Sequence, residues 1–152
     1  MKVSFHIPGI PVPKQSFRAG GRFGGWQPKR VTQYKKLVQA VALKAKIEAD
    51  WVKPKSCTPV LVRFIFAWPW PKATKKSLRD SRAFRVTTPD IDNVEKACLD
   101  GMGCLWEDDR QVTAVFKAKL NVPRGQEGVT VIVETLEDKH EQARCLGVIH
   151  PG

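Results

Sequence analysis

The sequence predicts a small single α+β domain with a mixed β-sheet and helices packed on it. Residues 60–68 form a nearly continuous run of β-branched and aromatic side chains, as expected for a buried central strand. Residues 29–50 carry apolar side chains every three or four positions, which indicates an amphipathic helix. Residues 112–121 and 129–134 alternate in polarity, which indicates two more strands. A chain of 152 residues with 42% hydrophobic content fits one domain.

The remaining segments complete the order strand, loop, helix, strand, loop, helix, strand, strand. Residues 2–7 alternate and predict an opening strand, and the glycine-rich residues 19–25 predict a mobile basic loop. Residues 93–102 predict a short helix, which Gly101 and Gly103 help to end. Residues 123–128 predict a hairpin turn between the last two strands.

The last residues show no clear period. We therefore expect a folded domain over residues 1–137 and a peripheral, frayed tail over residues 138–152. His140, Cys145 and His150 are evenly spaced in this tail, but we do not expect a metal site there. None of the four cysteines forms a CxxC pair, so we expect reduced thiols and a cytoplasmic protein. The N-terminus lacks signal-peptide features, and no apolar run approaches the roughly 20 residues that cross a bilayer.

Charge is distributed unevenly along the chain. The net charge is +11, yet seven of the fifteen acidic residues lie between Asp90 and Asp109, where Lys96 is the single cation. A polyanion is attracted to the basic remainder, and a carboxylate cluster repels it unless divalent cations are bound there. Basic surroundings with central carboxylates suit a metal-dependent nuclease. We expect nucleic acid as the partner rather than a membrane, because the cations are spread over several segments.

The basic segment from Lys72 to Arg85 contains six cations against one acid, Asp80. We expect it to be a flexible loop that contacts phosphates, because loops rich in Lys and Arg carry much of the affinity for DNA. A second basic region lies near the N-terminus. The predicted DNA-contacting residues are Lys14, Arg18, Arg22, Lys72, Lys75, Lys76, Arg79, Arg82 and Arg85.

Asp90 and Asp92 form a D-x-D pair that follows Pro89. If this segment is extended, both carboxylates lie on the same face and can bind Mg²⁺ or Mn²⁺, which prefer oxygen ligands. A third ligand is expected from residues 107–109, and spacing alone does not choose between the two aspartates there. A helix N-cap at Asp92 or Asn93 would explain one of these residues without a metal.

Two motifs carry a family resemblance. The stretch TPDIDNVEKA at residues 88–97, followed by LWEDDRQV at residues 105–112, resembles the RusA-type Holliday junction resolvases, as does GIPVPKQ at residues 9–15. The similar region extends over about residues 3–136. The resemblance implies a bacterial or phage-encoded, nucleoid-associated homodimer that resolves four-way DNA junctions in recombination and repair by paired symmetric nicks.

The resemblance also implies site residues. It identifies Asp90, Asp92, Lys96 and Asp109 as catalytic, with the three aspartates as ligands of Mg²⁺, for which Mn²⁺ is the alternative. Lys96 falls one helical turn after Asp92, where its ammonium can reach a phosphate. The competing interpretation is a surface ion ladder of Asp92, Lys96 and Asp100, worth only about 0.3–0.5 kcal/mol per pair.

Two other functions fit parts of the pattern. A non-catalytic module that binds branched DNA would explain the charge but not the full set of carboxylates. A transferase with a metal–nucleotide D-x-D site would explain the aspartates but not the charge or the short chain. The residues Trp26, Trp68, Trp70 and Trp106 could stack on bases, although core packing is the more common role for such side chains.

Overall fold

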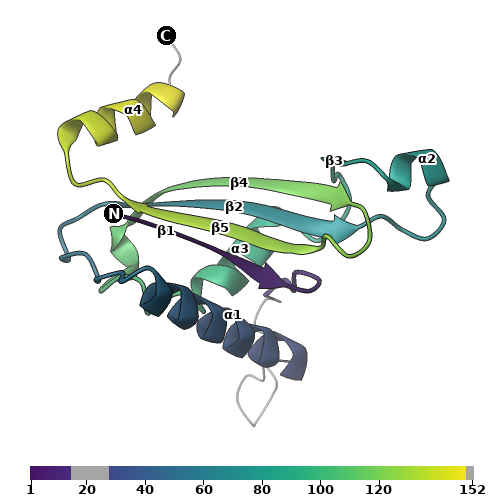
Figure 1. Cartoon of the computed structure of the whole chain (residues 1–152), viewed down its shortest axis with the longest axis horizontal. Coiled ribbons are helices and arrows are strands. Elements are labelled where there is room, and N and C mark those ends of the chain that lie inside the picture. The colour runs from purple at the N-terminus through teal and green to yellow at the C-terminus, as the bar shows by residue number, and fades with distance from the viewer. Residues whose placement is uncertain (15–27, 150–152) are drawn as a thin grey trace, which may run out of the picture.

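The structure, a computed structural model, describes residues 1–14 and 28–149 (Figure 1). The predicted loop at 19–25, Arg18, Arg22, Trp26 and His150 lie outside these residues. The elements in chain order are β1 (Lys2–Pro8), α1 (Lys29–Glu48), β2 (Val60–Pro69), α2 (Lys76–Arg79), β3 (Ala83–Phe84), α3 (Ile91–Leu99), the 3₁₀ turn η1 (Asp109–Gln111), β4 (Val112–Val122), β5 (Gly128–Thr135) and α4 (Lys139–Ile149).

The strands form one mixed sheet in the order β1-β5-β2-β4-β3. β2 and β4 are parallel, while β1 with β5, β2 with β5 and β3 with β4 are antiparallel. The α+β class with a mixed sheet is therefore confirmed. The hairpin predicted at residues 123–128 is wrong, because β4 and β5 lie on opposite sides of β2 and the connection crosses the end of that strand.

The core lies between one face of the sheet and helices α1 and α3. Alternate side chains of β2, from Val60 to Trp68, point to this layer and are at most 5% exposed. The apolar stripe of α1 packs on them, with Val38 and Ala42 fully buried. Tyr34 of α1 meets Cys98 of α3, with 3.9 Å between the hydroxyl oxygen and Sγ, and burial raises the pKa of both groups. These contacts fix α1 on the sheet and α3 against α1.

Three segments differ from the sequence-based predictions. The basic segment from Lys72 to Arg85 is not wholly a loop, because it contains α2 and the two-residue strand β3, although all its residues except two keep large exposed surfaces. The tail forms the helix α4 rather than a frayed end. α3 begins at Ile91, two residues earlier than predicted.

The structure also bears on the cysteines and on membrane-spanning helices. All four cysteines are free thiols, and Cys98 is buried in the core. Among the described helices, none is long and apolar enough to cross a bilayer.

Candidate active site

Asp90 and Asp92 lie at the N-terminal end of α3, and two lysines of β4 hold this end in place. Lys119 Nζ donates hydrogen bonds to the carbonyl oxygens of Thr87 at 2.8 Å and Pro89 at 2.7 Å. The segment that leads into the helix is thereby tied to the sheet. Asp90 is the N-cap residue, with extended backbone angles and no capping hydrogen bond from its side chain. Its carboxylate is exposed.

Asp92 belongs to the first turn of the helix and contacts Lys117 of β4. Lys117 Nζ lies 2.5 Å from Asp92 Oδ1 and also contacts the Glu95 carboxylate. The hydrogen bond from Lys117, together with its charge and that of Lys96, lowers the pKa of Asp92. Partial burial disfavours the charged form of Lys117, but the two carboxylates raise its pKa overall. The result is a lysine shared between two acids at the predicted site.

The extended D-x-D geometry expected from the sequence is wrong in one respect. Only Asp90 has an extended backbone, because Asp92 is the second residue of the helix α3. The predicted N-cap at Asp92 or Asn93 is also wrong, since Asp90 occupies that position. Acidic side chains are common at helix N-termini, where they are favourably placed toward the helix dipole.

Lys96 is exposed on α3, one turn after Asp92. The predicted ion ladder does not form: Asp92 pairs with Lys117, and Asp100 pairs with Lys14 at 2.5 Å. Among the ion pairs of the described residues, none includes Lys96. The Lys14 backbone amide also donates to the Asn93 carbonyl at 2.8 Å, so this predicted DNA contact serves to tie the N-terminal segment to α3.

Asp109 is the first residue of the turn η1, which follows α3 in the chain. Its Oδ1 accepts a hydrogen bond of 2.9 Å from the indole of Trp106, which is 1% exposed. The neighbouring Asp108 caps the turn through the Arg110 amide and also binds the Arg110 guanidinium. These contacts lower the pKa of Asp108 to about 2. The two aspartates thus have different partners, and only Asp108 is used as a cap.

Gln111 fixes this turn and was not singled out by the sequence analysis. Its Oε1 accepts hydrogen bonds from the amides of Glu107 and Asp108 at 2.9 and 3.0 Å. Its Nε2 donates to the carbonyl oxygens of Lys55 at 2.8 Å and Thr58 at 3.2 Å. A side chain that is 3% exposed therefore connects the acidic turn to the loop before β2.

The structure does not bring the three predicted aspartates together within one chain. Asp92 lies beside Lys117, whereas Asp109 comes just before Val112, where β4 begins. The strand from Val112 to Lys117 spans roughly 16 Å at about 3.3 Å per residue. Within residues 1–14 and 28–149, no group of three or more His, Cys, Asp or Glu side chains is placed to hold a metal ion.

The pair Asp90 and Asp92 nevertheless fits a hard divalent cation. Both are exposed oxygen donors at one helix end. Mg²⁺ is commonly held by one or two carboxylates, with waters and substrate phosphates as the other ligands. The donor set present at this helix end is therefore of the kind that Mg²⁺ uses with a phosphodiester.

Comparison with known families decides the identity of the fold. The profile of the family described as endodeoxyribonuclease RusA matches residues 8–134. The chain belongs to the RusA endodeoxyribonuclease family. No match was found among curated proteins. RusA enzymes are endodeoxyribonucleases that act on Holliday junctions. The matched region contains α3, η1 and both motifs, whereas α4 follows its end.

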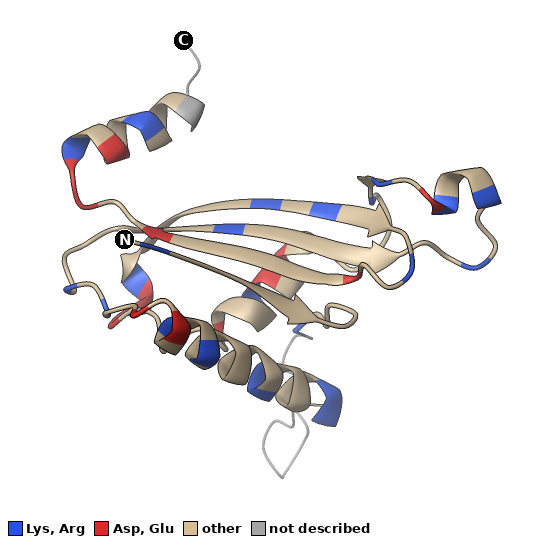
Figure 2. Cartoon of the chain, viewed as in Figure 1, with Lys and Arg blue, Asp and Glu red and all other residues tan. Residues whose placement is uncertain are grey.

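The basic side chains of this RusA-family protein are spread over α1, α2 and the strands, while acidic side chains gather near α3 and the segment after it (Figure 2). Beside α2 lies a surface hollow of about 360 Å³. Four cations and one acid, Asp80, line it, and Arg124 is not among the predicted DNA contacts. The cations are Lys72, Lys76, Arg79 and Arg124. Such a hollow is suited to a phosphate group.

Other predicted DNA contacts have partners within the RusA fold. The Arg85 guanidinium binds the Thr88 carbonyl and Asn121 and lies over the Trp68 ring, 5.2 Å from its centroid. Arg82 donates to Gln126 at 2.7 Å. Trp68 and Trp106 are buried, in agreement with the core role that the sequence analysis favoured over base stacking.

Proposed function

We propose that this RusA-family chain is a metal-dependent endonuclease that resolves four-way DNA junctions by paired nicks, acting as a homodimer in recombination and repair. The observation that carries the proposal is the acidic N-terminus of α3, where Asp90 and Asp92 stand exposed in an otherwise basic protein of an endodeoxyribonuclease family.

In the proposed mechanism, Asp90 and Asp92 are the residues that would hold the divalent ion, Mg²⁺ or Mn²⁺. When bound, such an ion lowers the pKa of its water and offsets the charge that develops on a phosphate. Lys117 orients the Asp92 carboxylate through one oxygen and leaves the other available. Lys119 fixes the position of Asp90 by holding the segment before it. Lys96, which has no ion-pair partner among the described residues, contacts a phosphate oxygen of the scissile strand.

Asp109 is included in the proposed site because it lies in the family motif at residues 105–112. Within one chain its carboxylate belongs to η1 and accepts a hydrogen bond from Trp106. The other carboxylate oxygen of Asp109 takes no part in this hydrogen bond and can take part in the reaction. We propose Asp109 as a catalytic residue whose contribution must be tested separately from that of the α3 pair.

The proposed substrate is branched DNA held by the basic surface. The cations that line the hollow beside α2 have a phosphate as the simplest common ligand. Backbone contacts of this type give affinity that falls with salt and does not depend on sequence. They position the duplex arms, while the acidic helix end acts on the backbone at the branch.

The test uses labelled four-way, forked and linear DNA with Mg²⁺, Mn²⁺ or EDTA. We expect paired nicks in the four-way junction with metal and none with EDTA. Asp90→Asn and Asp92→Asn should abolish cleavage, weaken Mn²⁺ binding in calorimetry and leave junction binding intact. Asp50→Asn is the matched control, because this exposed residue has a φ of 48°, which asparagine tolerates.

Three outcomes would contradict the proposal. Cleavage at the wild-type rate by either variant would remove that aspartate from the site. Cleavage in EDTA would exclude a metal mechanism. Tight junction binding with no cleavage under any metal would favour the alternative, a non-catalytic module for branched DNA.

A further inference from the structure

Lys117 places an ammonium group directly beside a proposed metal ligand. The Nζ atom of this β4 residue lies 2.5 Å from Asp92 Oδ1 on α3. A cation in this position repels a divalent ion and competes with it for the same carboxylate, because both are attracted to the same negative charge. Paired with Asp92 alone, Lys117 would neutralise one of the two proposed ligands. A metal can bind well here only if another group balances the charge of Lys117.

Glu95 is such a group. It follows Asp92 by three residues, so the two side chains lie on the same face of α3. Its carboxylate contacts the same Lys117 Nζ that Asp92 contacts. The side chain of Glu95 is 16% exposed and that of Asp92 is 70% exposed, so Glu95 is the inner of the two acids. Lys117 is thus held between an inner and an outer carboxylate.

The charges at this end of α3 then match a divalent ion. Asp90, Asp92 and Glu95 carry one negative charge each, and Lys117 offsets one of the three. Two negative charges remain, as many as the positive charges of Mg²⁺ or Mn²⁺. Lys96 adds a cation on the same helix, but the phosphate that it is proposed to contact brings its own negative charge. Without Glu95, a single negative charge would face the ion.

Glu95 is not placed to bind the ion together with the two aspartates. Across the two described stretches of the chain, no group of three or more His, Cys, Asp or Glu side chains is arranged to hold a metal ion. One oxygen of Glu95 is also engaged by Lys117. Glu95 can therefore influence the metal site through Lys117 rather than as a ligand.

We propose that Glu95 is a positioning residue of the metal site: it holds the Lys117 ammonium back from Asp92 and balances its charge. One Asp92 oxygen and the negative charge that attracts a divalent ion are thereby preserved. The inference rests on the proposed metal-dependent function and concerns the affinity for the ion rather than the cleavage step. Residues that support metal ligands without touching the metal commonly change its affinity about 10–100-fold.

Calorimetry with Mn²⁺ alone, on the full chain without DNA, measures this affinity. Glu95→Gln should raise the Kd for Mn²⁺ about tenfold or more. Glu95→Asp keeps the charge but draws the carboxylate back from Lys117 by one methylene, so it should raise the Kd by a smaller factor. In a Lys117→Met background, Glu95→Asp should leave the Kd unchanged, because the charge is the same and there is no ammonium to hold.

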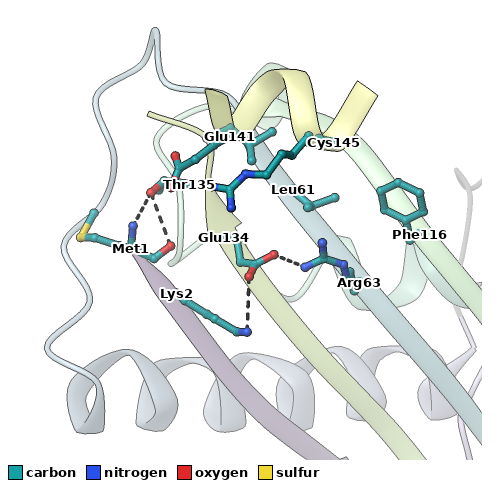
Figure 3. A pocket seen from close by; sticks show the side chains of 11 residues that line it. Met1, Lys2, Leu61, Arg63, Phe116, Glu134, Thr135, Glu141 and Cys145 are labelled. Carbon is teal, nitrogen blue, oxygen red and sulfur yellow. Dashed lines mark hydrogen bonds and ion pairs between the residues drawn. The ribbon is translucent and has the colours of Figure 1, made fainter. Parts of the chain in front are cut away.

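Glu134→Gln is the matched control. Glu134 is also a partly buried glutamate, with a side chain that is 23% exposed, and Figure 3 shows Lys2 and Arg63 both pointing to it. Val133 of β5 points to the core, so the next residue, Glu134, points to the face of the sheet away from α3. The control should bind Mn²⁺ with the wild-type Kd. Thermal unfolding followed by circular dichroism accompanies every variant, since a purely structural role of Glu95 would lower the Tm without changing the Kd.

An unchanged Kd in Glu95→Gln would overturn the inference and leave the nuclease function standing. An equal effect of Glu95→Asp with and without Lys117 would also overturn it, because Glu95 would then bind the ion itself. A wild type that binds no Mn²⁺ would contradict both the inference and the metal-dependent function. The expected changes in Kd in a protein that never cuts DNA would keep the inference and reject the nuclease function.

Discussion

Replacing Gln111 with leucine should destabilise the fold, because the side-chain amide of Gln111 connects the acidic turn to the loop before β2. Leucine has nearly the same volume but can neither accept nor donate a hydrogen bond. The amides of Glu107 and Asp108 lose their acceptor. The carbonyls of Thr58 and, at 3.4 Å, Pro54 lose their donor. The Lys55 carbonyl still accepts from the Thr58 amide at 2.8 Å, so it is only partly affected.

The magnitude follows from these four groups, of which the Pro54 carbonyl has the longest hydrogen bond. A buried polar group left without a partner costs about 1–3 kcal/mol. The amides of Glu107 and Asp108 lie near the surface, where water can replace part of the lost bond. We therefore expect a total loss of about 2–4 kcal/mol in the free energy of unfolding. At roughly 3 °C per kcal/mol for a domain of this size, the melting temperature should fall by about 6–12 °C.

Urea denaturation followed by tryptophan fluorescence measures this loss. Gln111→Glu provides the graded comparison, because its carboxylate can still accept from the two amides but cannot donate to Lys55 and Thr58. Its stability should lie between those of the wild type and Gln111→Leu. A loss below about 0.5 kcal/mol for Gln111→Leu, which is the range of ordinary surface substitutions, would refute the reasoning.

Two further predictions concern charge. Lys117→Met should raise the pKa of Asp92, which carboxyl NMR can measure, because the carboxylate loses its hydrogen bond from Lys117. For the same reason cleavage at saturating metal should slow about tenfold or more, since the carboxylate is no longer oriented. An unchanged pKa and rate would show that Lys117 is only a surface contact. Lys76→Glu combined with Arg79→Glu should weaken binding of every DNA shape and reduce the slope of log K against log salt by about 1.8, since each phosphate contact contributes about 0.9. Equal slopes for mutant and wild type would show that α2 does not contact phosphate.

The elements that the sequence predicted well are those with a long regular pattern. α1 and β2 have enough apolar periodicity to be recognised from local sequence, because most of their residues pack on the core. α2 and β3 are short and carry no buried residue, so no periodicity reveals them. The order of the strands is also not local information: β4 and β5 follow each other in the chain, but β5 pairs with β1 and β2.

The residues of the candidate site also fall into two groups: those that a local motif reveals and those that only the fold reveals. Asp90 and Asp92 are recognisable because they stand together in one short motif, where helix capping would require only one of the two carboxylates. Lys117 and Gln111 escaped notice because their roles depend on register and on contacts with distant segments. Lys117 looks like a solvent-facing residue of an alternating strand until its pairing with Phe64 shows that it points to the helix layer.

The position of β5 between β1 and β2 makes the order of folding dependent on the last third of the chain. Among the described strands, β1 pairs only with β5, and the Met1 carbonyl accepts a hydrogen bond from the Thr135 amide. Until residues 128–135 leave the ribosome, the first strand has no neighbour, and one edge of β2 stays open. Contacts between such distant segments slow folding, because a long loop must close before they form. Synthesis that stops before residue 128 should therefore yield a chain that cannot complete its sheet, because β1 and one edge of β2 lack their partner strand.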